Sequence, residues 1–216
     1  MLNTNRESFK ENIKIDYLIY FALLLVTGSF ISHLNNNNSQ FNNFGSLVWF
    51  ITFMILTLSF SPIRKLISPL LNFKPMRKPT AYFYIFATLA ITFLLLKVCV
   101  KYEILIDHNL IVFYKNGLLE GRDLFGVMDA ILFVPIWEEM FFRGILLLTL
   151  AKLLNPFWAI AISSVIFAMF HPLYLITALI SGLLMALITF KTKSLLPSVI
   201  THSIWNLYST KLFLYF

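Results

Sequence analysis

The amino-acid sequence predicts an all-α fold, a polytopic transmembrane helical bundle of about seven spans. Of its 216 residues, 59% are hydrophobic and only 12% are charged, which is about half the charged share of a typical soluble domain. The apolar runs are continuous and approach the roughly 20 residues that a helix needs to cross a bilayer, whereas a membrane β-barrel would show short alternating segments. The basic residues lie in clusters between these runs, as the positive-inside rule requires of cytoplasmic loops.

The same clustering decides how the net charge of +7 is interpreted. A basic chain can bind nucleic acid, but membrane topology alone accounts for where these charges lie. The expected partner is therefore the lipid bilayer, and no nucleic acid is expected. The single cysteine, Cys99, lies in an apolar run and cannot form an internal disulfide. Frequent Asn and Lys, small size and short loops suggest a bacterial source, and hence a bacterial cell membrane.

A polar tail and three spans are expected in residues 1–125. The tail, 1–15, mixes acidic and basic side chains. The segment 61–80 has five basic residues and no acidic one, which predicts a cytoplasmic loop and, by alternation, a cytoplasmic N-terminus. The approximate bounds of the three spans are 16–33, 44–60 and 81–100.

Four further spans are expected in residues 126–216, where they form a core. Residues 101–125 mix charges and are placed outside, with the segment Ile104–Tyr114 too short to span and expected at the interface. Basic turns near residues 152 and 191–193 are cytoplasmic, which leaves the C-terminus outside. The approximate bounds of the four spans are 126–150, 156–171, 173–190 and 195–214.

Two adjacent acidic residues interrupt the apolar run that should form the fourth span. Glu138, Glu139 and Arg143 lie within it, and a charged side chain near the middle of a spanning helix costs about 2.5–3.5 kcal/mol by insertion scales. Such residues are usually turned inward and functional, although they also serve as polar clamps between helices. Glu139 and Arg143 are four residues apart and share a face, which favours an ion pair. Glu138 is left as the unpaired acid, available to take and return a proton.

Two residues flank this acidic pair. Pro135 removes a backbone hydrogen bond one turn upstream and is expected to kink the helix near the acids. Gly144, directly after the arginine, lets another backbone approach closely.

The predicted core also contains imidazole and amide groups. His171 ends the fifth predicted span, four residues after Phe167, and His202 and Asn206 share one face of the seventh. A lone histidine in a helix is more often a packing residue than a catalyst. At 1.5 Å per residue from the inner ends of the spans, Glu138, His171 and Asn206 lie at depths of about 18, 22 and 16 Å, and His202 at about 10 Å. These side chains are therefore expected to converge in one cavity.

Taken in order, the patterns Glu-Glu-x-x-x-Arg, Phe-x-x-x-His and His-x-x-x-Asn resemble the CAAX prenyl protease and bacteriocin-processing family of intramembrane proteases, also called the Abi family. The patterns begin at Glu138, Phe167 and His202. Each is weak alone, but three in order within predicted helices are specific. The resemblance covers about residues 126–210 and implies peptide hydrolysis within or beside the membrane.

The resemblance also implies a role for each motif residue. Glu138 resembles the acid that activates a water molecule, and His171 resembles its partner in holding that water. His202 and Asn206 resemble the groups that stabilise the oxyanion. Hydrolysis does need a base next to a water molecule and donors where negative charge develops.

The resemblance implies that Glu139 and Arg143 support the structure. Their pairing also bears on whether the protein binds zinc. Glu138, His171 and His202 contain enough ligands for a two-histidine, one-carboxylate zinc site. However, the helical His-Glu-x-x-His pattern is absent from the sequence, and Glu139, once paired with Arg143, leaves no acid to orient a ligating histidine. We therefore expect a metal-independent hydrolase without a cofactor, while the sequence leaves zinc open.

Three functions of different classes compete. The leading hypothesis is an intramembrane endopeptidase, a hydrolase acting on a peptide or membrane-protein substrate. The alternative is a non-catalytic bacteriocin self-immunity or partner-binding membrane protein on the same scaffold. A transporter that relays protons would explain buried ionisable groups, but it does not explain the ordered motifs.

Overall fold

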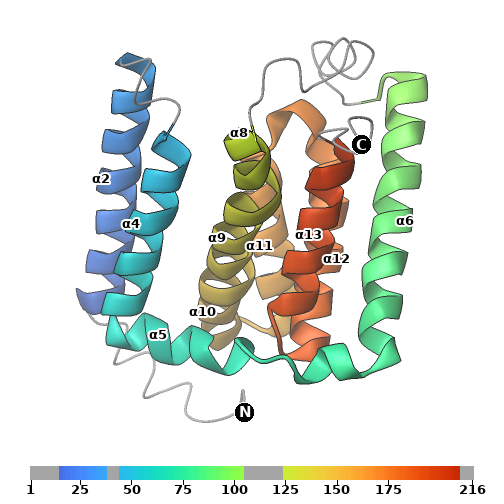
Figure 1. Ribbon diagram of the computed structural model, residues 1–216. Coiled ribbons are helices and arrows are strands. Elements are labelled where there is room, and N and C mark those ends of the chain that lie inside the picture. Colours follow the sequence, from blue (N-terminus) through green and yellow to red (C-terminus); the bar gives the residue numbers. More distant parts are fainter. Residues whose placement is uncertain (1–14, 38–43, 105–123, 210–216) are drawn as a thin grey trace.

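The computed structural model describes residues 15–37, 44–104 and 124–209, and within these ranges every element is a helix (Figure 1). This confirms the all-α prediction for the described part of the chain. The predicted tail up to residue 14, most of the predicted interfacial segment (105–114) and the end of the last predicted span lie outside the described residues. The division of the chain at residues 125 and 126 stays a prediction.

The helices form an upright bundle with one pair at one edge and a single helix at the other. Helix α2 (Ile15–Asn37) packs against α4 (Gly45–Ser59), and α6 (Pro79–Tyr102) packs against α12 and α13 on the opposite side (Figure 1). The elements between them are α8 (Leu124–Met128), α9 (Val134–Glu139), α10 (Leu147–Leu153), α11 (Pro156–Met169), α12 (Leu175–Thr192) and α13 (Leu196–Ser209).

Within the described residues, three helices are long and apolar enough to cross a membrane: Asp16–Asn37, Pro79–Tyr102 and Pro172–Thr192. They coincide with the first, third and sixth predicted spans. A fourth is added if α4 and the bent segment after it are counted together, and Pro156–Met169 is apolar but shorter. The predicted count of seven spans, and a core of four, is therefore not confirmed.

The segment predicted as the loop 61–80 is mostly helical. The chain bends by 97° after α4, since Phe60 is extended and Pro62 can begin a helix but not continue one. Helix α5 (Ser61–Ile67) and two 3₁₀ turns (Ser68–Leu70 and Lys74–Arg77) then run across the end of the bundle (Figure 1). All five basic residues of the segment are exposed, so the segment is amphipathic rather than a free loop.

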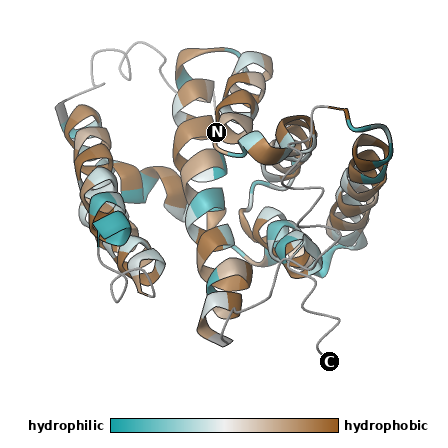
Figure 2. Cartoon of the chain, turned by 90° about the horizontal axis from the view of Figure 1, so that it is seen from above, coloured by the Kyte–Doolittle hydropathy of each residue, from teal (hydrophilic) through white to brown (hydrophobic). Residues whose placement is uncertain are grey.

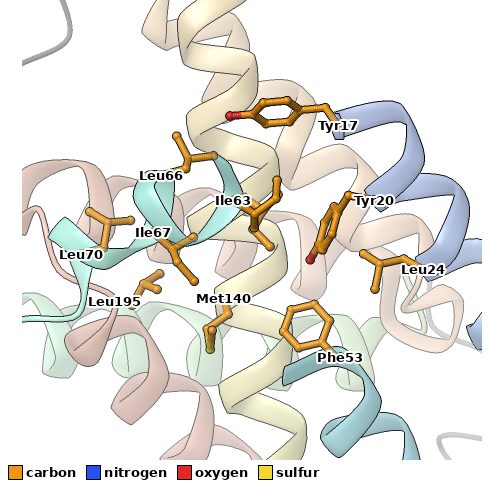
Figure 3. Close-up of a cluster of buried hydrophobic side chains, with 11 residues drawn as sticks. Tyr17, Tyr20, Leu24, Phe53, Ile63, Leu66, Ile67, Leu70, Met140 and Leu195 are labelled. Atoms are coloured by element: carbon orange, nitrogen blue, oxygen red, sulfur yellow. The ribbon is translucent and has the colours of Figure 1, made fainter. Parts of the chain in front are cut away.

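The apolar side of α5 belongs to the largest core cluster (Figure 3). The backbone N–H of Leu195 donates to the carbonyl of Leu70 at 3.0 Å, which ties this segment to the turn before α13. The Tyr20 and Thr57 hydroxyls bond at 2.9 Å between α2 and α4. The cluster joins α2, α4, α5 and the acidic helix through Tyr17, Tyr20, Leu24, Phe53, Ile63, Leu66, Ile67, Leu70, Met140, Ile145 and Leu195.

The outer surface of the bundle is strongly apolar. Seen from above, hydrophobic residues appear on the outer helices at both edges of the bundle (Figure 2). Large side chains such as Leu25, Phe83 and Phe86 are exposed on α2 and α6. Contiguous apolar surface of this kind is rare on soluble monomers and needs a covering. Together with the long apolar helices, it identifies an integral membrane protein.

The predicted fourth span is one long helical run with two π-helical interruptions. Two π-helical segments, Asp129–Phe133 and Met140–Leu146, flank α9. In them the hydrogen bonds span five residues, as from Val134 N–H to the Asp129 carbonyl. Such π segments are rare in proteins overall, and many of those that occur lie at functional sites. Glu138 and Glu139 stand at the end of the short α-helical piece between them.

Candidate active site

The acidic pair and its arginine are inside the bundle. The exposed fraction is 9% for Glu138, 0% for Glu139 and 1% for Arg143. A charge in such a place is tolerated only when it is paired or hydrogen-bonded. The partners of each carboxylate therefore define the site.

Glu139 links the arginine to a histidine of another helix. Its Oε1 accepts from Arg143 Nη1 at 2.7 Å, which is the expected ion pair. The same oxygen accepts from His202 Nδ1 at 2.9 Å. The expectation that Arg143 occupies Glu139 fully, leaving no acid to orient a histidine, is therefore wrong. A carboxylate oxygen has two lone pairs, and α13 brings His202 to the second one.

Glu138 faces both histidines without bonding to either. Its Oε2 lies 3.8 Å from His171 Nε2 and 3.9 Å from His202 Nε2, beyond the 2.7–3.2 Å of a direct hydrogen bond. This oxygen has no hydrogen-bond partner among the described residues. Polar groups at such a separation commonly share a water molecule. The structure thus brings Glu138, His171 and His202 together from three separate parts of the described chain.

The Nδ1 atom of each imidazole already takes part in a hydrogen bond. His171 Nδ1 donates to the Phe167 carbonyl at 2.8 Å, and His202 Nδ1 donates to Glu139. In a neutral imidazole with a proton on Nδ1, Nε2 is an acceptor. Both rings therefore present an acceptor toward the Glu138 carboxylate, and a small donor such as water could donate to two of these three groups.

His171 lies just outside its helix rather than in its last turn. Helix α11 ends at Met169, and the His171 N–H donates to the Ala168 carbonyl at 2.8 Å in the turn that follows. Pro172 explains the early end, because a residue before proline is disfavoured in the helical region. His171 nevertheless stays beside Phe167 through its Nδ1 bond.

Phe167 holds the charged groups in place with its ring. The Arg143 guanidinium carbon lies 4.1 Å from the centre of this ring, and the His171 ring centre lies 4.4 Å from it. A cation over an aromatic face is stabilised by the ring quadrupole. Gly182 makes the position possible, since a Cβ there would lie 3.1 Å from Phe167 Cδ1. The Phe-x-x-x-His pattern therefore has a packing reason as well as a chemical one.

Asn206 is directed at the backbone of the acidic helical run. Its Nδ2 donates to the Ala130 carbonyl at 2.8 Å. In the π segment this carbonyl would pair with the N–H of residue 135, and Pro135 has none. The kink expected from Pro135 is thus a π segment whose unpaired carbonyl is satisfied from α13. This contact places the Asn206 amide against the backbone of the acidic helical run.

Two residues next to the histidines were missed in the sequence. Tyr174 and Thr92 line the same cavity as His171 and His202, and the Tyr174 and His171 ring centres lie 5.6 Å apart. Tyr174 follows His171 by three residues, so its proximity was readable from spacing. Thr92 comes from α6, and nothing in the sequence connects this helix with the motifs.

Comparison with known proteins gives one match. The family described as "Type II CAAX prenyl endopeptidase Rce1-like" matches residues 121–208, whereas no curated protein and no solved structure matches the chain. The matched segment contains all three motifs and spans α8 to α13, almost the range expected from the resemblance. Residues 121–208 of this chain are therefore similar to the type II CAAX prenyl endopeptidase Rce1-like family of membrane proteases.

Proposed function

We propose that this protein is an intramembrane endopeptidase that hydrolyses a peptide bond of a membrane-associated protein or peptide, using a water molecule activated by Glu138. The main support is the position of Glu138 Oε2, 3.8 and 3.9 Å from the Nε2 atoms of His171 and His202. A base, two imidazoles and a separation suited to one water molecule are what glutamate-assisted hydrolysis requires.

In the proposed reaction, Glu138 Oε2 takes one proton from the water as its oxygen attacks the carbonyl carbon of the substrate. His171 Nε2 accepts from the other O–H and fixes the direction of attack. The carboxyl group then returns its proton to the nitrogen of the leaving amine as the C–N bond breaks. The water oxygen, with its second proton, ends in the new carboxyl group, and Glu138 is regenerated as a carboxylate.

His202 and Asn206 are the proposed stabilisers of the oxyanion. Because Nδ1 of His202 donates to Glu139, Nε2 can donate only when the ring has a second proton. The Glu139 carboxylate supports that form by supplying a counter-charge, as the aspartate does in a catalytic triad. Asn206, one turn further along α13, is the second proposed group.

The mechanism is proposed to need no metal. Two ligand atoms on a tetrahedral zinc, with bonds of about 2.0–2.1 Å, are about 3.4 Å apart. The Glu138 oxygen is farther than this from both imidazole nitrogens, at 3.8 and 3.9 Å. The bond between His202 and Glu139, on the other hand, is also the arrangement that orients zinc ligands. A chelation arm therefore belongs in the functional test.

The test is cleavage of a fluorogenic reporter peptide by protein reconstituted in liposomes. We expect the wild type to cleave it, Glu138→Ala to lose at least about 10²-fold in rate, the lower range for a general base, and the chelated wild type to retain its rate. Equal rates for wild type and Glu138→Ala, or no cleavage by either, would reject the protease proposal. Loss of activity on chelation, restored by stoichiometric zinc, would replace the mechanism but not the function.

We also propose that the N-terminus is cytoplasmic in a bacterial cell membrane, because the basic side chains of 61–80 are all exposed and positive charge is retained inside. In a Cys99→Ala background, Lys74→Cys should stay unlabelled by a membrane-impermeant maleimide in intact cells. It should become labelled once the cells are opened. Labelling from outside intact cells would reverse the topology.

A further inference from the structure

Helix α6 turns a buried face that includes two threonines, Thr88 and Thr92, toward the matched segment. Its buried residues recur every three or four positions, which places them on one face. This face packs against α12 and α13 (Figure 1), although α6 lies outside the matched residues 121–208. The buried residues are Ala81, Ile85, Thr88, Thr92, Leu96 and Cys99.

A cavity lies where this face of α6 meets His171 and His202. The centre of a water molecule can occupy a volume of about 20 Å³ in this cavity. That is room for about one water molecule. A buried water is held when it finds two to four polar partners. The polar residues that line the cavity include Thr88, Thr92, His171, Tyr174, Ser181 and His202.

Thr92 contributes a buried hydroxyl group to this cavity. The residue is 2% exposed, and its Oγ1 has no hydrogen-bond partner among the described residues. Threonines in helices usually bond to the carbonyl four residues back, as Thr192 and Thr201 do here at 2.8 Å. A buried hydroxyl without a partner is unfavourable, so the Thr92 hydroxyl calls for a partner inside the cavity.

We propose that Thr92 holds a water molecule in this cavity against His171 and His202, and so positions the water that Glu138 activates. The proposal rests on the proposed function. Glu138 does not itself line the cavity, but its Oε2 lies 3.8 Å from His171 Nε2. A water molecule held at His171 can therefore donate one O–H to His171 Nε2 and the other to Glu138 Oε2. It then needs a donor to its own oxygen, and the Thr92 hydroxyl is such a donor. Helix α6 thereby becomes part of the active site, and Thr92 is a positioning residue.

The experiment compares three substitutions in the liposome assay. Thr92→Val keeps the shape and removes the hydroxyl, Thr92→Ser keeps the hydroxyl, and Thr177→Val is the matched control. Thr177 is 1% exposed and its Oγ1 also has no partner among the described residues, but it does not line the cavity. We expect kcat to fall about tenfold or more in Thr92→Val, the loss of one positioning hydrogen bond. KM should stay near the wild-type value, and thermal stability should equal or exceed it.

Thr92→Ser should stay close to the wild-type rate, and Thr177→Val should leave kcat unchanged. A wild-type kcat in Thr92→Val, or an equal loss in Thr177→Val, would overturn the proposal while the protease function stands. If the wild type cleaves nothing, the test is a high-resolution structure of the protein. It should show a water molecule within hydrogen-bond distance of Thr92 Oγ1. Its absence there would overturn the proposal without reference to activity.

Discussion

Arg143→Ala is expected to remove most of the folded protein, whereas Glu138→Gln should leave the yield nearly unchanged. Arg143 and Glu139 are both fully buried and bonded at 2.7 Å. Removing one partner of a buried pair costs about 3–5 kcal/mol, because the other charge is left uncompensated. That is a large part of the total stability of a domain. Arg143→Ala also loses the contact with the Phe167 ring.

The measurement is the amount of monodisperse protein after detergent extraction and size-exclusion chromatography at equal expression. Glu138→Gln is the matched control, since Glu138 neighbours Glu139 in the same helix, but its Oε2 has no hydrogen-bond partner among the described residues. Equal yields of wild type and Arg143→Ala would show that the ion pair does not hold the fold.

The long apolar helices were predictable because lipid imposes a length and composition that the sequence shows directly. Three predicted spans coincide with helices of spanning length. The bend after α4 was not predicted, although Pro62 could have indicated it. The sequence shows five basic residues in 61–80, but burial of the apolar side of α5 depends on contacts with distant residues such as Tyr20 and Met140.

Within the site, local contacts were predictable and contacts between helices were not. The pair of Glu139 and Arg143 follows from a spacing of four residues. The bond from His202 to the same Glu139 oxygen joins residues 63 positions apart, and no periodicity encodes it. The resemblance of the motifs indicated which residues meet, and the geometry of their meeting required the structure.

The backbone of the acidic helical run shows the same division. Pro135 predicted a disturbance, since it lacks an N–H. The form of the disturbance, a π segment from Asp129 to Phe133, depends on the Asn206 amide that satisfies the Ala130 carbonyl from α13. Only the packed bundle supplies that amide.

A double substitution should separate the two roles of Glu139. Glu139→Gln alone leaves the Arg143 charge buried and uncompensated, so the folded yield should fall. Adding Arg143→Met removes that charge and replaces it with an apolar side chain of similar length. Replacing both members of a buried pair by uncharged groups is often neutral for stability, and the yield of the double variant should recover.

Its activity should not recover. Glu139 Oε1 is the acceptor for His202 Nδ1, and an amide there provides no counter-charge for a second proton on the ring. Loss of the acid that orients a catalytic histidine lowers kcat by up to about 10⁴-fold in a catalytic triad. We expect kcat of Glu139→Gln/Arg143→Met to fall toward that of Glu138→Gln in the liposome assay, with folded yields near wild type. Wild-type kcat in the double variant would limit Glu139 to a packing role. If the folded yield of the double variant stays low, Arg143 stabilises the fold mainly through its contact with Phe167. The guanidinium carbon of Arg143 lies 4.1 Å from the centre of the Phe167 ring.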